Sequence, residues 1–109
     1  MDSAKMLRLL GLGVRGRLAV VGVEQTRAAA NAGKLILAVI AADASQHSRE
    51  KVIPLLTARG VSMIETASAT ALGAAVGRDV TAVVGVLDEQ LANGIRAVQA
   101  AHGEIGRKG

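Results

Sequence analysis

The stretch that decides the fold runs from Gly22-Val23-Glu24-Gln25-Thr26-Arg27 through an alanine-rich segment to Gly33-Lys34, and ends with the apolar run Leu35–Ala42 and Asp43. The alanines predict a helix over 25–32, because alanine is the best helix former, and Gly33 suits the residue that follows a helix. The apolar run has no alternation, which is typical of a strand covered on both faces. Backbone N–H groups at the start of a helix receive anions or polar groups of a ligand. We therefore expect a nucleic-acid contact at Gly22, with the remaining chain as its support.

The remaining chain continues this alternation of helices and strands. Helices are expected over 2–13, 25–32, 46–59, 68–76 and 88–102, and strands over 18–21, 35–42, 61–66 and 80–87. This order predicts an α/β protein, a three-layer α/β/α sandwich with helices on both faces of a small sheet. Residues 1–102 are expected to form a single domain, followed by a basic flexible tail at 103–109.

Several side chains mark where the helices begin and where one of them is interrupted. Ser45, Ser68 or Thr70, and Asp88 are predicted N-caps, since short polar side chains accept hydrogen bonds from the first turn of a helix. Pro54 falls inside the third helix. An interior proline removes one hydrogen bond and clashes with the preceding turn, so we expect a kink or two helical pieces there.

The segment Gly11-Leu12-Gly13-Val14-Arg15-Gly16 has the spacing of the dinucleotide-binding fingerprint. That fingerprint follows a strand and opens a helix. Here the glycines follow a helical pattern and precede the strand at 18–21. We therefore reject a dinucleotide site and expect these glycines to let the chain turn from helix to strand.

The composition limits the kinds of function. Half of the 109 residues are apolar and none is aromatic. Proteins that stack bases on aromatic platforms are therefore excluded, such as RNA-recognition sheets and oligonucleotide-binding barrels. The absence of cysteine excludes a disulfide, a thiol nucleophile and a cysteine-based zinc site. The cytoplasm is the expected location, since no apolar run has the length of a membrane helix and the N-terminus lacks a signal-peptide pattern.

The charge balance allows two interpretations. Thirteen Lys and Arg residues against nine Asp and Glu residues leave a net charge of +4. A small basic domain is compatible with a polyanionic partner. The same charge is also compatible with solubility alone.

Catalysis and metal binding find little support. Asp43, Ser45 and His47 lie close together in sequence, but they suit a helix cap and a turn better than a catalytic triad. His47 and His102 are far apart without a cluster of further ligands, so a metal site is not expected. We expect no enzyme activity, no cofactor and no small-molecule substrate.

A set of short motifs occurs in a characteristic order. It comprises Leu10-Gly11-Leu12, Gly16-Arg17-Leu18, Gly22-x-x-Gln25-Thr26, Gly33-Lys34, Ile40-Ala41-Ala42-Asp43-Ala44-Ser45 and Leu72-Gly73-x-Ala75-x-Gly77. In this order the chain resembles the L7Ae family of ribosomal proteins, which recognise kink-turns in RNA, and within it the short bacterial YlxQ-like branch. The resemblance implies a mixed sheet of about four strands and a non-catalytic protein that binds structured RNA such as rRNA, with ribosome-associated proteins as further candidate partners.

The resemblance also implies where the RNA would bind. The family uses the helix start after the glycine and the loop after Leu72-Gly73, where a polar pair meets sheared guanine–adenine pairs and an apolar residue covers a flipped-out nucleotide. The corresponding candidate residues are Gly22, Val23, Glu24, Gln25, Arg27, Lys34, Arg78, Asp79 and Val80. We expect Gln25 to contact base edges, and Arg27 and Lys34 to act mainly on phosphates.

The chain departs from the family pattern at two places. A lysine of the family is replaced by Ala28, beside which Arg27 could supply the charge, and further lysines are replaced by Ala69 and Thr70. An alternative function therefore stays open, a protein–protein adaptor that keeps the fold and has lost the RNA site.

Overall fold

The computed structural model describes the backbone of residues 3–108 and the side chains of residues 4–100. Within this range, helices and strands alternate from end to end, as the sequence predicts. The elements are α1 (Ser3–Arg15), β1 (Ala19–Val21), α2 (Val23–Asn31), β2 (Leu37–Ala41), α3 (Gln46–Ala58), β3 (Ser62–Thr66), α4 (Ala69–Ala75), β4 (Val83–Val86) and α5 (Glu89–Lys108). Helix α2 begins two residues earlier than expected, directly after Gly22.

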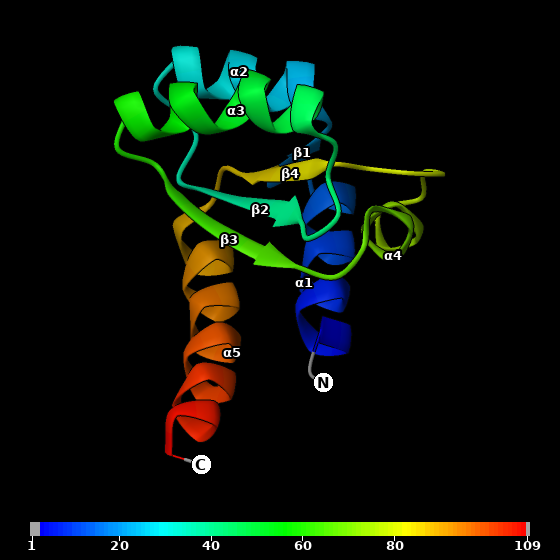
Figure 1. Cartoon of the computed structure of the whole chain (residues 1–109), viewed down its shortest axis with the longest axis vertical. Coiled ribbons are helices and arrows are strands. Elements are labelled where there is room, and N and C mark those ends of the chain that lie inside the picture. The colour runs from blue at the N-terminus through cyan, green and yellow to red at the C-terminus, as the bar shows by residue number, and fades with distance from the viewer. Residues whose placement is uncertain (1–2, 109) are drawn as a thin grey trace.

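The strands form one mixed sheet in the order β1-β4-β2-β3. Strand β2 runs parallel to β3 and antiparallel to β4, and β1 is antiparallel to β4. Helices α2 and α3 lie over one face of the sheet, and α1, α4 and α5 lie over the other (Figure 1). The predicted three-layer α/β/α sandwich with a small mixed sheet is confirmed.

The core is aliphatic and is divided by the sheet into two halves. All five residues of β2 are buried. Its residues Leu37, Val39 and Ala41 pack with α1, α4 and α5, whereas Ala38 and Ile40 pack with α2 and α3. The largest fully buried side chains of the helices are Leu10, Leu56, Leu72 and Ile95. Burial of each such side chain contributes about 1.5–3 kcal/mol to folding, and this contribution comes from aliphatic residues because the chain has no aromatic one.

Three of the predicted helix caps are confirmed. The Ser48 N–H donates to Ser45 Oγ over 3.1 Å, the Ala71 N–H to Ser68 Oγ over 3.0 Å, and the Leu91 N–H to Asp88 Oδ2 over 2.9 Å. These caps fix the starts of α3, α4 and α5. Helix α2 begins without one.

Helix α3 is a single element of 13 residues that contains Pro54. Of the two predicted outcomes, the division into two helical pieces is wrong and the kink stays a prediction. Pro54 has no N–H to donate to the Glu50 carbonyl one turn earlier. Both residues are exposed on the outer side of the helix. Water can therefore satisfy the carbonyl, while the buried side chains of Val52 and Leu56 hold the two halves of the helix to the sheet.

Of the three glycines predicted to turn the chain from helix to strand, Gly16 lies in the turn after α1, as expected, but Gly11 and Gly13 lie inside the helix. A Cβ on Gly11 would lie 2.6 Å from the Ala75 carbonyl oxygen, and one on Gly13 would lie 2.4 Å from Leu91 Cδ2. These glycines allow α1 to pack closely against α4 and α5. Neither glycine stands between a strand and a helix start, which agrees with rejecting the dinucleotide fingerprint.

Helix α5 is assigned as far as Lys108, but the side chains of 101–109 lie outside the described part of the chain. The predicted flexible tail at 103–109 therefore stays a prediction, as does the domain boundary at residue 102. No helix among the described residues is long and apolar enough to cross a membrane.

Candidate nucleic-acid interface

The start of α2 and the residues leading into β4 are neighbours in the sheet. The Gly22 N–H donates to the Val83 carbonyl over 2.9 Å, directly beyond the pairing of Val21 with Val84. In Figure 1 both segments lie at the right-hand end of the sandwich, where α3 also begins and the α4–β4 loop extends. The two segments that the sequence predicts for RNA contact are thus brought to one end of the molecule.

The first segment is the open start of α2. Gly22 is the N-cap with φ 96°, a left-handed conformation that other residues rarely adopt, and no side chain caps the helix. Val23 is half-buried, whereas Glu24 and Gln25 are exposed. Since the N–H groups of a first turn have no partner within the helix, the uncapped α2 start offers donors beside a carboxylate and an amide.

The second segment is the α4–β4 loop. Gly77 has φ 77° and turns the chain after α4, and the Arg78 N–H donates to the Gly73 carbonyl over 2.7 Å. At the far end of the loop, the Thr81 N–H donates to the Ala69 carbonyl over 3.0 Å. These bonds hold the loop against α4 and leave Arg78, Asp79 and Val80 exposed, with Val80 exposed to 67%.

Close packing on Gly73 determines how near this loop lies to α4. A Cβ on Gly73 would lie 2.6 Å from the Asp79 carbonyl oxygen and 3.0 Å from the Val80 nitrogen. Both atoms belong to the backbone and cannot swing aside. The absence of a side chain at Gly73 is therefore what allows the loop to lie on α4.

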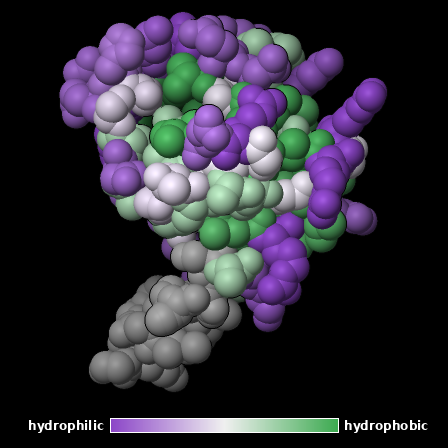
Figure 2. All heavy atoms as spheres, turned by 90° about the vertical axis from the view of Figure 1, so that its right-hand side faces the viewer, coloured by the Kyte–Doolittle hydropathy of each residue, from purple (hydrophilic) through white to green (hydrophobic). Residues whose placement is uncertain are grey.

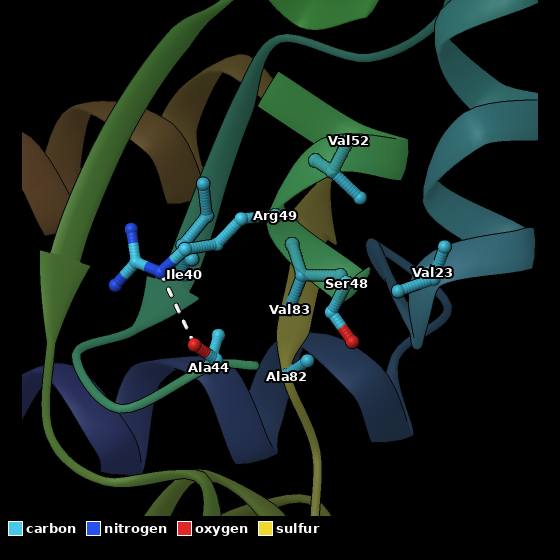
Figure 3. A pocket seen from close by; sticks show the side chains of 8 residues that line it. All are labelled: Val23, Ile40, Ala44, Ser48, Arg49, Val52, Ala82 and Val83. Carbon is cyan, nitrogen blue, oxygen red and sulfur yellow. Dashed lines mark hydrogen bonds between the residues drawn. The ribbon is translucent and has the colours of Figure 1, made fainter. Parts of the chain in front are cut away.

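The β2–α3 connection is a third segment at this end, and the sequence did not reveal its role. Asp43 Oδ1 accepts a hydrogen bond of 2.7 Å from the Ala69 N–H at the start of α4. The Arg49 guanidinium donates to the carbonyls of Ala42 and Ala44 over 2.9 and 3.2 Å, and it pairs with Glu65 of β3. Figure 3 shows Arg49 turned toward Ala44.

Arg49 and Asp43 thus act on the interface indirectly. Arg49 holds the loop that carries Asp43, and Asp43 holds the start of α4, on which the α4–β4 loop rests. The sequence does contain a signal for Asp43, because it is a polar residue directly after a buried strand. Arg49 could not be found in this way, since on a helix wheel it is one more outward-facing charge.

Two of the predicted cations have surroundings that the sequence does not indicate. The Arg27 guanidinium donates to the Lys51 carbonyl of α3, so it joins the two helices on the same face of the sheet. Lys34 follows α2 and precedes β2. The nine residues of α2 carry the chain about 13 Å away from Gly22, which places Lys34 at the opposite end of the sandwich.

The interface carries charges of both signs. Glu24 and Asp79 are exposed beside Arg78 and Lys51, and Lys51 Nζ lies 3.9 Å from Glu24 Oε2. Figure 2 views this end directly and shows hydrophilic side chains along its upper border, with apolar side chains among them toward the centre. The exposed Val80 adds to this apolar character. With acidic and basic side chains both exposed, this end of the molecule does not carry charge of a single sign.

A small cavity lies between the starts of α2 and α3. Its volume is about 10 Å³, and Val23, Ile40, Ser48 and Val52 are among the residues that line it (Figure 3). This volume admits no more than about one water molecule. The cavity therefore has no room for a base or a small-molecule substrate, and a ligand at this end must bind on the surface.

The side chains that were weighed against catalysis and metal binding are described except for that of His102, which lies outside the described side chains. Asp43 and Ser45 cap helix starts, as the sequence favours, and His47 is exposed. Among the side chains that the structure describes, no group of three His, Asp or Glu residues is placed to hold a metal ion.

One protein family and two solved structures are similar to this chain. The model of the ribosomal protein L7Ae/L30e/S12e/Gadd45 family matches residues 4–96. A solved structure of a protein with unknown function from Bacillus halodurans C has a TM-score of 0.80 and 29% identity, covering 87% of this chain and 96% of that chain. The Giardia lamblia 15.5kD RNA binding protein has a TM-score of 0.74 and 25% identity, covering 88% of this chain and 82% of that chain. No curated protein matches the chain.

Proposed function

Because the chain belongs to the ribosomal protein L7Ae/L30e/S12e/Gadd45 family, we propose that it is a non-catalytic protein that binds structured RNA through the end of the sandwich at Gly22. The observation that carries this proposal is the uncapped start of α2. It stands beside the exposed loop residues Arg78, Asp79 and Val80. The similarity to an RNA-binding protein from Giardia lamblia supports the same partner.

The recognition proposed here is that of a kinked duplex of the kink-turn type, such as one in rRNA. The amide of Gln25 donates one hydrogen bond and accepts another, and the Glu24 carboxylate accepts from the amino and imino groups of guanine. Sheared guanine–adenine pairs present such groups at their edges. With no aromatic side chain in the chain, binding relies on shape and base edges and not on stacking.

The α4–β4 loop supplies the remaining contacts. Val80 is the apolar surface on which an unstacked nucleotide rests, and Arg78 contacts phosphate. Arg27 and Lys34 are no longer proposed as RNA contacts, because one is held by α3 and the other lies at the far end. The chain is expected in the cytoplasm, and its place in the YlxQ-like branch remains a prediction from the motifs.

One observation favours the adaptor as a second candidate function. The family lysine is replaced by the exposed Ala28, and the Arg27 guanidinium keeps its charge but is directed to the Lys51 carbonyl of α3. An adaptor would keep the fold, bind ribosome-associated proteins and show no preference for a kinked RNA.

A pair of glutamine variants separates the two functions. Gln25 and Gln90 are both exposed near the start of a helix, but α2 begins at the proposed interface and α5 at the opposite end of the sheet. Gln25→Ala should cost about 1–3 kcal/mol in binding a kink-turn RNA and little for an unkinked duplex. Gln90→Ala should change neither affinity.

The measurement is a fluorescence-anisotropy titration of both variants with both RNAs, after circular dichroism shows that the fold survives. If Gln25→Ala weakens both RNAs equally, or neither, the start of α2 does not contact base edges. The adaptor would then be the better account.

A further inference from the structure

An open groove runs between α1 and α4, lined by residues other than the proposed RNA contacts. Its volume is about 500 Å³, and Leu7, Gly11, Ala71 and Ala74 form its apolar lining, with Arg8 and Arg15 beside them. The groove shares no residue with Gly22–Gln25 or Arg78–Val80. Gly11 lets the backbones of α1 and α4 approach closely, because a Cβ there would lie 2.6 Å from the Ala75 carbonyl oxygen.

The charge along this groove has one sign. Lys5, Arg8 and Arg15 are exposed on α1, α1 contains no acidic residue, and α4 contains no charged residue at all. None of the three cations has an ion pair or a side-chain hydrogen bond with the side chains that the structure describes. A surface with unpaired cations and no acid is complementary to an acidic partner.

The apolar lining indicates which kind of acidic partner fits. Methyl groups and a leucine gain free energy by burial against apolar side chains, whereas a nucleic-acid backbone presents only phosphate and sugar to them. Leu12 stands one turn from both arginines and is 52% exposed, which widens the apolar surface. A groove between two helices, lined by small residues, accommodates the apolar face of a third helix.

We propose that the α1–α4 groove docks an acidic amphipathic helix of a partner protein. The partner places small or medium apolar side chains against Leu7, Ala71 and Ala74. Arg8 and Arg15 stand two helical turns apart, so two carboxylates on the partner, about seven residues apart, pair with them. The groove and the RNA interface share no residues, so docking of this partner is a function beyond RNA binding alone.

The test uses the full chain and two synthetic helical peptides labelled with fluorescein. One peptide has leucine and alanine on one face with glutamates seven residues apart, and the other has lysines in place of the glutamates. The glutamate peptide should bind the wild-type chain at least about tenfold more tightly than the lysine peptide, because like charges opposed at an interface are strongly unfavourable.

Two variants of the groove and two matched controls locate the binding. Arg8→Glu should weaken the glutamate peptide about tenfold and strengthen the lysine peptide, since it reverses one rim charge. Lys34→Glu makes the same charge change at an exposed site elsewhere and should alter neither. Ala74→Leu fills the exposed groove floor and should weaken both peptides, whereas Ala97→Leu, on an exposed position of α5, should not.

The effect of Arg8→Glu on the two peptides tests the proposal even if Ala74→Leu disturbs the fold. Equal affinity of the two peptides for the wild-type chain would overturn the proposal, and so would failure of Arg8→Glu to favour the lysine peptide. If neither peptide binds and Arg8→Glu instead weakens an RNA duplex more than Lys34→Glu does, the groove receives nucleic acid and the proposed partner is wrong.

Discussion

Replacing Gly73 by alanine tests whether the α4–β4 loop belongs to the RNA interface. The added Cβ would lie 2.6 Å from the Asp79 carbonyl oxygen and 2.8 Å from the Asp79 carbonyl carbon. An ordinary separation of ~3.5 Å requires a movement of about 0.9 Å. Because the opposing atoms are backbone, the loop must rise as a unit and carry Arg78 and Val80 with it.

The size of the effect follows from this displacement. A hydrogen bond of ~2.9 Å that lengthens by about 0.9 Å is no longer a hydrogen bond. Losing one polar contact of this kind costs about 0.5–1.5 kcal/mol, so the affinity for a kink-turn RNA should fall about threefold to tenfold. In stability, overpacking costs about 1–3 kcal/mol, offset by the ~1 kcal/mol by which alanine favours a helix over glycine.

Gly94→Ala is the matched control. Gly94 also lies inside a helix, but a Cβ there would meet only Leu9 Cδ1, at 3.7 Å. This variant should gain about 0.5–1 kcal/mol of stability from helix propensity and leave RNA binding unchanged. The assay is anisotropy titration with the kink-turn RNA, together with urea unfolding of each variant.

If Gly73→Ala folds normally and binds the kink-turn RNA as the wild type does, the loop lies outside the RNA interface, or its distance from α4 does not affect binding. A loss of affinity in both glycine variants would instead point to a general effect of the substitutions.

Two further pairs of variants follow the same logic. Arg78→Ala should weaken kinked and plain RNA alike and reduce the salt slope by about one counterion, whereas Lys34→Ala, at the far end, should leave the slope unchanged; equal slopes would remove Arg78 as a phosphate contact. Asp43→Ala and Asp88→Ala each remove the acceptor of one backbone N–H at a helix start and should cost about 0.5–2 kcal/mol, seen as a Tm lower by several degrees. Only Asp43→Ala should also weaken the kink-turn RNA, because Asp43 holds Ala69 beside the loop; equal RNA affinities would contradict its positioning role.

The layers of the fold followed from patterns that act locally. Each helix or strand is specified by residues that are neighbours in the sequence. Examples are the alanines of α2, the apolar runs at 35–42 and 80–87, and the caps Ser45 and Asp88. These local patterns predicted the order of helices and strands. The glycines of α1 were misjudged for the opposite reason. Their partners, Ala75 and Leu91, are remote in sequence, so nothing near Gly11 or Gly13 shows that a close contact requires them.

The candidate site was predicted only in part, for the same physical reason. Gly22, Gln25 and the loop at Arg78–Val80 come together because β1 pairs with β4. The resemblance to the family implied that these two segments meet, but the strand pairing was not predicted. Lys34 stands close to them in sequence but is carried away by the length of α2. Arg27 has its partner on α3, 24 positions along the chain, and no local pattern indicates this bond.

Whether the chain recognises a kinked duplex is tested most directly by comparing the affinities of two RNAs for the wild-type chain. A kink-turn RNA and an unkinked duplex of equal length and charge are titrated at several salt concentrations. If the open start of α2 and the α4–β4 loop recognise a kinked duplex, the kink-turn RNA should bind at least about tenfold more tightly, and the difference should persist as salt weakens both complexes. Equal affinities with equal salt slopes would contradict recognition of the kinked shape and leave only attraction between charges.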